Sequence, residues 1–290
     1  MKLLLKFNLV FLIVFALGLG AAGYIARALL QQNAHDEVLD RARLLMENAL
    51  AVSSYTATQI APLLETQMKY TFLPQSVPAY SSTEVLNTLR KNHPEYAYKP
   101  AMLNPTNPRD RAQDWEEDVI QQFKQSPETK EFIGQRPTPA GLVTYIARPI
   151  KIVNPDCLRC HSTVEAAPKP LVEKYGPANG FGWNLNEVLG AQVVSVPMSV
   201  PLARADRAFG VVMGLLAGVF LLIGLTLNLM LWKLVIRPVS KLSQLSDRVS
   251  LGELDAPDFA VKSKDEIGTL AESFTRMRKS MVHAMRMLDN

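Results

Sequence analysis

The chain has 290 residues, of which 48% are hydrophobic and 20% are charged, and its formal net charge is +4. Residues 31–207 hold 18 Lys and Arg against 19 Asp and Glu, so the positive excess lies toward the two ends of the chain. A near-neutral middle excludes the basic footprint of a nucleic-acid-binding protein, and basic ends beside apolar runs indicate a membrane anchor.

The first apolar run covers Leu9–Ala26, is closed by Arg27, and predicts a transmembrane helix over residues 7–30. Its 18 residues are few for a span but exceed the usual apolar core of a signal peptide, about 7–15 residues. A cleaved signal peptide is the alternative, because the small residues at positions 20–23 offer a cleavage site. The length of the run favours an uncleaved anchor.

The segment after this run is expected to continue as a helix with one apolar stripe. Pro62 should kink or end it, because proline lacks a backbone donor and its ring clashes with the preceding turn. The stripe predicts packing against a sheet or against the same helix of a second copy. Its members recur at steps of four and three residues: Val38, Ala42, Leu45, Ala49, Val52 and Thr56.

Two later segments are rich in β-branched residues and predict strands, at 141–153 and 190–200. Between them, residues 175–184 form a glycine-rich stretch with aromatic side chains. Such a stretch suits the wall of a flat cofactor, and an ordinary turn is the alternative.

Both cysteines of the chain, Cys157 and Cys160, follow the first predicted strand, and His161 comes directly after them. A Cys-x-x-Cys-His run spaces two thiols for the vinyl groups of a haem and brings an imidazole to the iron. Zinc would need further Cys or His ligands, and the other histidines are scattered. A redox or structural disulfide is the remaining alternative. The motif therefore favours one covalent haem c with His161 as an axial ligand.

A second apolar run, residues 208–232, carries no charge and predicts a second transmembrane helix. Two spans place residues 31–207 on one side of the membrane and both termini on the other. Basic residues near the termini favour cytoplasmic ends. Covalent haem attachment generally takes place outside the cytoplasm, so the motif assigns residues 31–207 to the periplasm and the protein to the inner membrane.

The tail holds two heptad runs joined by a connector that contains Gly252 and Pro257. Neither helix can bury its stripe alone, whereas two helices from each of two chains can close a four-helix bundle. We therefore expect a homodimer. The two stripes are Val235, Val239, Leu242, Ser246 and Val249, then Ile267, Leu270, Phe274, Met277 and Met281.

Three short motifs make residues 233–288 resemble the HAMP linker of membrane sensors, which passes motion from a membrane span to an output module. They are Arg237-Pro238 after the span, Gly252-Glu253-Leu254 in the connector, and Asp265-Glu266-Ile267-Gly268 at the second helix. The resemblance implies a parallel dimer. No kinase, cyclase or methyl-accepting region follows these motifs in the sequence, so a separate cytoplasmic effector such as a kinase is expected, and a lost effector is the alternative.

The middle of the chain also resembles a known family, through "YAYKPAMLNPTNPRDRAQDWE", "CLRCHS" and "AAPKPLVEKYGPANGFGWNLNEVLGAQVVSVPMS". These strings, in this order, are similar to periplasmic single-haem c-type sensor domains. The resemblance implies an α+β fold, a PAS-like antiparallel sheet with flanking helices, with His161 as the proximal ligand. Some relatives place a Cys thiolate on the opposite face of the iron, but the matching stretch here is Ile60-Ala61-Pro62.

The sixth ligand therefore stays open at this point. Met198, in a predicted strand, and His93, before Pro94, are the candidates, and an empty or water-filled position is the alternative. Other methionines of the middle region lie at 46, 68 and 102.

The predicted function is a membrane-bound haem sensor of redox state or of a small gas, which signals through HAMP. The alternative is a membrane-anchored c-type cytochrome for electron transfer. The HAMP-like tail argues against it, because electron transfer needs no signal relay. No enzyme activity is expected. The one dense group of acids is interpreted as a solvated helix face: Asp114, Glu116, Glu117 and Asp118.

Overall fold

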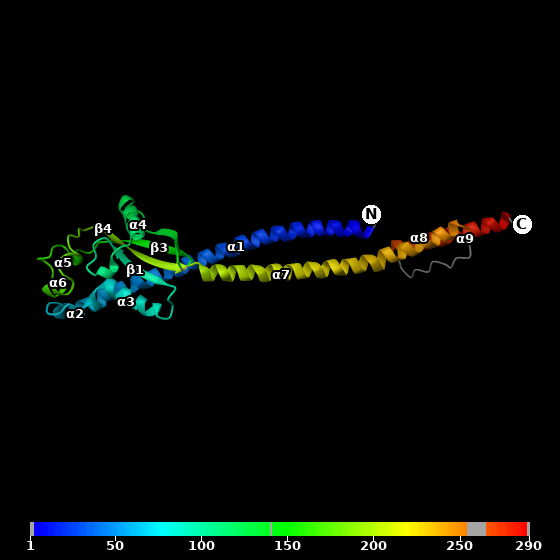
Figure 1. The fold of residues 1–290 in the computed structure, drawn as a ribbon. Helices are drawn as coiled ribbons and strands as arrows, with labels where there is room; N and C mark the ends of the chain where they lie inside the picture. The colour runs from blue at the N-terminus through cyan, green and yellow to red at the C-terminus, as the bar shows by residue number, and fades with distance from the viewer. Residues whose placement is uncertain (1–2, 140, 254–264, 289–290) are drawn as a thin grey trace. The chain divides into compact units, whose positions relative to one another are not determined.

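The computed structural model describes residues 3–139, 141–253 and 265–288 (Figure 1). It divides the chain into two compact units, Arg27–Ala208 and the segments on either side of it in sequence. The expected α+β class is confirmed, because the first unit holds a four-stranded antiparallel sheet with flanking helices.

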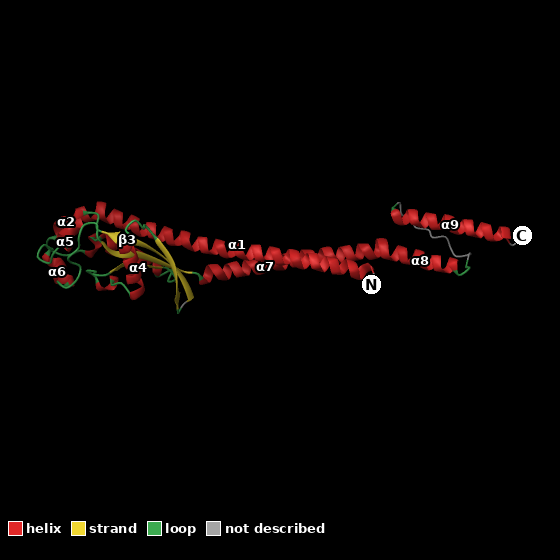
Figure 2. Ribbon diagram, turned by 90° about the horizontal axis from the view of Figure 1, so that it is seen from above, coloured by secondary structure: helices red, strands yellow, loops and turns green. Residues whose placement is uncertain are grey.

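The sheet has the strand order β1-β4-β3-β2, and every neighbouring pair is antiparallel. Its strands are drawn in yellow in Figure 2. The two strands predicted from β-branched residues form its centre, and the two edge strands were not predicted. The strands are β1 (Ala97–Met102), β2 (Phe132–Thr138), β3 (Gly141–Lys151) and β4 (Val188–Pro197).

One face of the sheet is covered by the long helix α1 (Leu3–Tyr55). Its buried residues Val38, Ala42 and Met46 pack against Ile146 and Val194 of the central strands. The predicted stripe thus packs against a sheet, which is the first of the two arrangements that the sequence predicted. Burying such apolar side chains stabilises the fold by about 1.5–3 kcal/mol for each large one.

Proline marks an irregular turn in this helix, as predicted. The π-helical turn η1 (Thr56–Ile60) directly precedes α2 (Ala61–Met68), which has Pro62 in its first turn. A widened turn accommodates the proline ring, which would otherwise clash with the carbonyl one turn earlier. Pro238 follows a second π-helical turn, η5 (Leu231–Ile236), in the same way.

The opposite face of the sheet carries α4 (Asp114–Gln125). Val119, Ile120 and Phe123 of this helix are buried and pack on the sheet over Ala147 and Val193. The other short helices of the unit are η2 (Pro74–Ser76), α3 (Pro78–Arg90), η3 (Pro108–Asp110), η4 (Pro155–Cys157), α5 (Leu158–His161) and α6 (Lys169–Tyr175).

The acidic start of α4 is not a uniformly solvated face, so that prediction was wrong for Glu116. This side chain is 3% exposed. It accepts hydrogen bonds from Lys99 Nζ at 2.7 Å and from the Gln113 backbone N–H at 2.8 Å. The sequence does not indicate the pair of Lys99 and Glu116, because Lys99 lies on β1, 17 residues before Glu116. Asp114 and Asp118 are exposed, as predicted.

The second unit contains the N-terminal part of α1 and most of α7 (Ser199–Met230). Leu4–Met68 and Ser199–Ser250 each include a window long and apolar enough to cross a membrane. Asn228 Nδ2 donates to Asn8 Oδ1 at 2.8 Å, and the rings of Phe15 and Phe220 meet edge to face at 4.5 Å.

The helices α8 (Arg237–Ser250) and α9 (Glu266–Leu288) also belong to this unit. Their contact buries Leu242, Val249 and Ala271. The rest of the predicted stripes includes exposed side chains, namely Val239, Leu270, Met277 and Met281. Of the predicted connector, Gly252 adopts a left-handed φ of 97°, whereas Leu254 and Pro257 lie outside the described residues.

Candidate functional site

The cysteine motif folds as a short helical turn at the end of β3. Asn154 caps it, because its side chain accepts the backbone N–H of Asp156 at 2.9 Å. Cys157 ends η4, and Cys160 and His161 fall in α5. Residues three and four apart on a helical turn share one side. The local fold therefore presents both thiols and the imidazole from the same turn.

The two thiols are free in the structure and enter different apolar clusters. Cys157 packs beside Ile152 and Leu189, and Cys160 packs beside Phe72 and Leu171. Burial raises the pKa of both thiols. A redox-active Cys-x-x-Cys pair has a lowered thiol pKa, so this environment argues against the redox alternative.

The imidazole of His161 is held by backbone and by an aromatic ring. Its Nδ1 lies 2.7 Å from the carbonyl oxygen of Gly180, and its ring stacks on Trp183 with centroids 3.8 Å apart. Burial lowers the pKa of His161, and the bond to Gly180 opposes that shift. A neutral ring that donates through Nδ1 keeps the Nε2 lone pair free, which is the form that binds metals.

A polar clamp holds the loop that supplies this carbonyl. The Asn104 side chain accepts the Gly180 N–H and donates to the Phe181 carbonyl, each at 3.1 Å. Gly180 has a φ of 85°, and a Cβ there would lie 2.8 Å from Thr106 Cα. Only glycine fits such a close approach without strain. The glycine-rich stretch of 175–184 thus forms one wall around His161, through Gly180 and Trp183.

Asn104 and Thr106 were not predicted as site residues. Thr106 Oγ1 lies 3.4 Å from the Nδ1 of His161, which is 55 residues further along the chain. Asn104 supports the imidazole indirectly, through Gly180. Their only sequence signal is the two Asn-Pro steps in "LNPTNP", which indicate turns but give no partner.

The structure brings neither candidate sixth ligand to the motif. Met198 is buried with Val38 on the α1 face, beyond the far end of β4 from Leu189, a distance of about 30 Å by strand geometry. His93 is 56% exposed and lies 3.5 Å from Glu95. The methionines that do reach the motif are Met102, in the Cys157 cluster, and Met68, in the Cys160 cluster.

No group of three or more His, Cys, Asp or Glu side chains converges among the described residues. The motif is therefore not extended into a zinc-type ligand set by any described side chain.

Comparison with known families covers most of the chain. A family model described as Tll0287-like matches residues 31–197. The chain belongs to the Tll0287-like family. A second model, that of the HAMP domain, matches residues 230–283. Both matches confirm the resemblances inferred from sequence.

Among solved structures, the "cyanobacterial heme-protein Tll0287" is similar at 15% identity and a TM-score of 0.41. The match covers 56% of this chain and 93% of that chain. A search of curated proteins gave no match.

Proposed function

We propose that this Tll0287-like domain binds one haem c through thioether bonds from Cys157 and Cys160, with His161 as an axial ligand. The observation that carries the proposal is the imidazole, whose Nδ1 is engaged by Gly180 at 2.7 Å while Nε2 remains available. The family to which the chain belongs takes its name from Tll0287, a haem protein, which supports the same cofactor. When bound, a haem supplies an iron that changes oxidation state or takes a diatomic ligand.

The residues around the motif fit such a group. The two thiols lie in separate apolar clusters, which suits the apolar faces of a macrocycle. The indole N–H of Trp183 is buried and has no hydrogen-bond partner among the described residues. A buried donor without a partner costs about 1–3 kcal/mol, so an acceptor at this position would stabilise the site. A haem carries carboxylate side chains that are able to accept this bond.

The domain order indicates signalling rather than catalysis. A Tll0287-like domain, two candidate membrane spans and a HAMP domain together fit a membrane signal transducer of the inner membrane. We further propose that residues 31–207 lie in the periplasm between spans 7–30 and 208–232, and that residues 233–288 act as the HAMP relay to a separate cytoplasmic effector. The signal is proposed to be the iron's oxidation state or a bound gas.

The attachment proposal predicts loss of denaturation-resistant haem staining in the Cys157→Ala, Cys160→Ala double variant. Single variants should keep one thioether and stain more weakly. His93→Ala is the matched control, since that exposed side chain contacts nothing at the motif and its staining should equal wild type. Staining that survives in the double variant would overturn the covalent attachment.

Optical spectra of the reduced protein, with and without CO, test the sensing proposal. A CO-induced shift of the Soret band supports an open sixth position and a gas-responsive sensor. If no shift is seen and the protein exchanges electrons rapidly with a soluble redox partner, the sensor function is wrong and an anchored electron-transfer cytochrome takes its place.

The relay is proposed to work as a homodimer. In one chain Leu270 is 48% exposed and Met277 is 50% exposed, although both belong to the heptad stripe of α9. A second copy would bury them in a parallel bundle. Single cysteines at position 270 or 277 should then cross-link between chains in the membrane.

Phe274→Glu should prevent that cross-linking, because an unpaired charge in a bundle core costs several kcal/mol. Haem staining should be unchanged, since the motif belongs to the other unit. Glu272→Gln, at a 77% exposed side chain on the same helix, is the control that should cross-link normally. Equal cross-linking in the Phe274→Glu background would rule out the bundle.

A further inference from the structure

A hollow lies on the sheet domain, and its lining includes no residue of the cysteine motif. It opens on the α4 face, where it occupies about 410 Å³. We call it the Trp115 cavity. Its lining includes Trp115, Arg136, Val143, Val193, Ser195 and Lys99.

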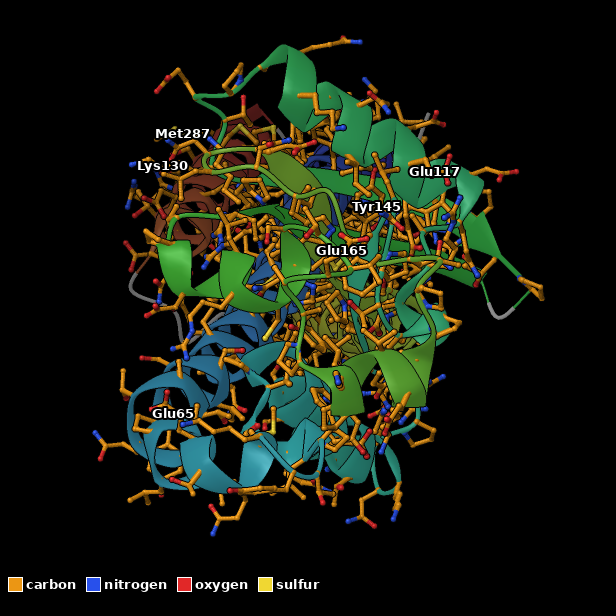
Figure 3. All side chains as sticks on the ribbon, turned by 90° about the vertical axis from the view of Figure 1, so that its left-hand side faces the viewer. Glu65, Glu117, Lys130, Tyr145, Glu165 and Met287 are labelled. Atoms are coloured by element: carbon orange, nitrogen blue, oxygen red, sulfur yellow. The ribbon has the colours of Figure 1, made fainter. Side chains whose placement is uncertain are left out.

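The cavity exists because α4 covers only part of its face. The helix starts at Asp114 and packs over the cross-strand row that includes Ala147 and Val193. The next row on the same face, which includes Tyr145 and Ser195, lies beside the helix start. Tyr145, labelled in Figure 3, packs at the edge of the cluster under α4. The uncovered part of the row forms the cavity floor.

Close packing shapes one wall. The rings of Trp115 and Tyr145 lie 5.1 Å apart. A Cβ at Gly134 would come within 2.7 Å of Tyr145 Cε1, so the glycine makes room for the tyrosine ring across β2. The guanidinium carbon of Arg136 lies 4.3 Å from the centroid of the Trp115 ring. Two aromatic rings and one arginine therefore stand together beside an apolar floor.

Most charges in the lining already have partners. Lys99 pairs with Glu116 at 2.7 Å. Arg109 pairs with Glu84, and its Nε lies 3.7 Å from Asp110.

Arg136 differs from these groups. No ion pair involves it among the described residues, and its Nε is buried without a hydrogen-bond acceptor. A buried charged donor that lacks an acceptor favours an anion at that position.

We propose that the Trp115 cavity is a second input site, which binds a small organic carboxylate with its carboxylate on Arg136 and its apolar body against Trp115 and Val143. The planar guanidinium fork matches a carboxylate in two parallel hydrogen bonds. The volume is at the low end for small-molecule sites, about 300–1,000 Å³, so the ligand is a compact metabolite rather than a polymer. The site goes beyond the haem proposal and does not depend on it.

Isothermal titration calorimetry of the full-length protein in a neutral detergent tests this site with benzoate and butyrate as probes. Both are small carboxylates with an apolar body. We expect saturable binding of at least one of them, and no heat from benzyl alcohol, which lacks the charge. Inorganic phosphate should bind at least about tenfold more weakly, because it has no apolar body to bury against Trp115 and Val143. A site that takes phosphate in preference to both carboxylates would overturn the assignment.

Arg136→Gln should weaken carboxylate binding by about tenfold or more, since it removes a charge-assisted bond. Arg136→Lys keeps the charge but not the fork, and should lie between Gln and wild type. Arg41→Gln removes an arginine outside the cavity lining and should bind as wild type does. Equal affinity in the Arg136→Gln and wild-type proteins would overturn the proposal, and so would absence of binding of either carboxylate by folded wild-type protein. Haem staining of the same samples reports separately on the motif.

Discussion

At the cysteine motif, His161 is fixed by a backbone carbonyl and an indole ring, and both cysteines are partly buried against apolar side chains. At the Trp115 cavity, the guanidinium of Arg136 stacks on a ring but meets no carboxylate among the described residues. One sheet domain thus carries an imidazole held in place by its neighbours and a guanidinium that has no anionic partner among the described residues. The first arrangement suits a resident group and the second suits an exchangeable one.

The loops that support the two sites differ as well. Asn104 fixes the loop at Gly180 by two hydrogen bonds, so the motif side resists displacement. The cavity side has Asp110, whose burial raises its pKa to about 6, despite the opposing charges of Arg109 and Lys99. Because Asp110 titrates near neutral pH, the charge in the cavity depends on pH. The motif side is instead held by fixed hydrogen bonds.

The largest effect is expected from His161→Ala. The variant should keep covalent haem, because the thioethers need only the cysteines, but it should lose the native ligand field and redox potential. Absorption spectra and a redox titration of the purified protein measure this. Spectra are compared at equal haem concentration, so that a lower yield of the variant does not affect the result. An unchanged Soret band and potential would remove His161 from the ligand set, and the contrast between the two sites would fail.

Gly180→Ala should come next, with a loss of about 4 kcal/mol in the free energy of unfolding. The change adds the cost of a left-handed alanine, about 1–2 kcal/mol, to overpacking against the Thr106 backbone, about 1–3 kcal/mol. Gly182→Ala is the matched control. It has a similar φ of 78° but open space around a new Cβ. It should cost only about 1 kcal/mol.

Chemical unfolding of the two glycine variants under identical conditions gives the comparison. The Gly180 variant should also perturb the haem spectrum, since its carbonyl holds His161. Equal losses in the two variants would mean that the wall around His161 is not tightly packed.

The central features were predictable from sequence because their signals are local. The β-branched runs gave β3 and β4, and the spaced apolar residues predicted the buried stripe of α1. The edge strands carry no such signal: β1 contains Lys99 and Pro100, and β2 contains Gly134 and Pro137. Proline is tolerated there because an edge strand leaves some backbone N–H groups without a ladder partner.

The site could be predicted only where its residues are adjacent in sequence. Cys157, Cys160 and His161 form one contiguous motif. The clamp through Asn104 joins residues 76 and 77 positions apart. The cavity likewise collects side chains from α3, α4 and all four strands. Such contacts follow from strand register and helix packing, which no local pattern specifies.

Asp110→Asn should stabilise the protein by about 2 kcal/mol at pH 7. The folded-state pKa, about 6, lies above the ordinary value of 3.8 because burial disfavours the charge. The folded protein therefore binds more protons than the unfolded chain between these values, and stability falls as pH rises from about 4 to about 6. The penalty is complete above that window, and asparagine removes it.

Unfolding midpoints of wild type and Asp110→Asn should converge near pH 4 and separate toward pH 7. Arg109 and Lys99 are the cations that face this carboxyl, and the nearby Tyr98 and Tyr175 stay neutral throughout the window because their pKa values are raised above 10. If the unfolding midpoints of the two proteins differ by the same amount at every pH, then Asp110 is not the group whose ionisation changes the stability.

The smallest effect on stability is expected from Arg136→Gln. Its guanidinium makes no ion pair among the described residues, so the substitution removes only the stacking on Trp115, about 1 kcal/mol or less. Part of this loss is offset, because glutamine carries no buried charge. Arg148→Gln is the comparison, since Arg148 pairs with Glu47 at 2.5 Å and with Glu131 at 3.1 Å. It should cost more than Arg136→Gln when both are unfolded chemically without added carboxylate.

With saturating benzoate, wild type should gain stability and Arg136→Gln should not, because a ligand that binds only the folded state stabilises it. A large loss in Arg136→Gln without ligand would mean that this arginine holds the fold itself, and the distinction between a resident and an exchangeable site would collapse at the cavity.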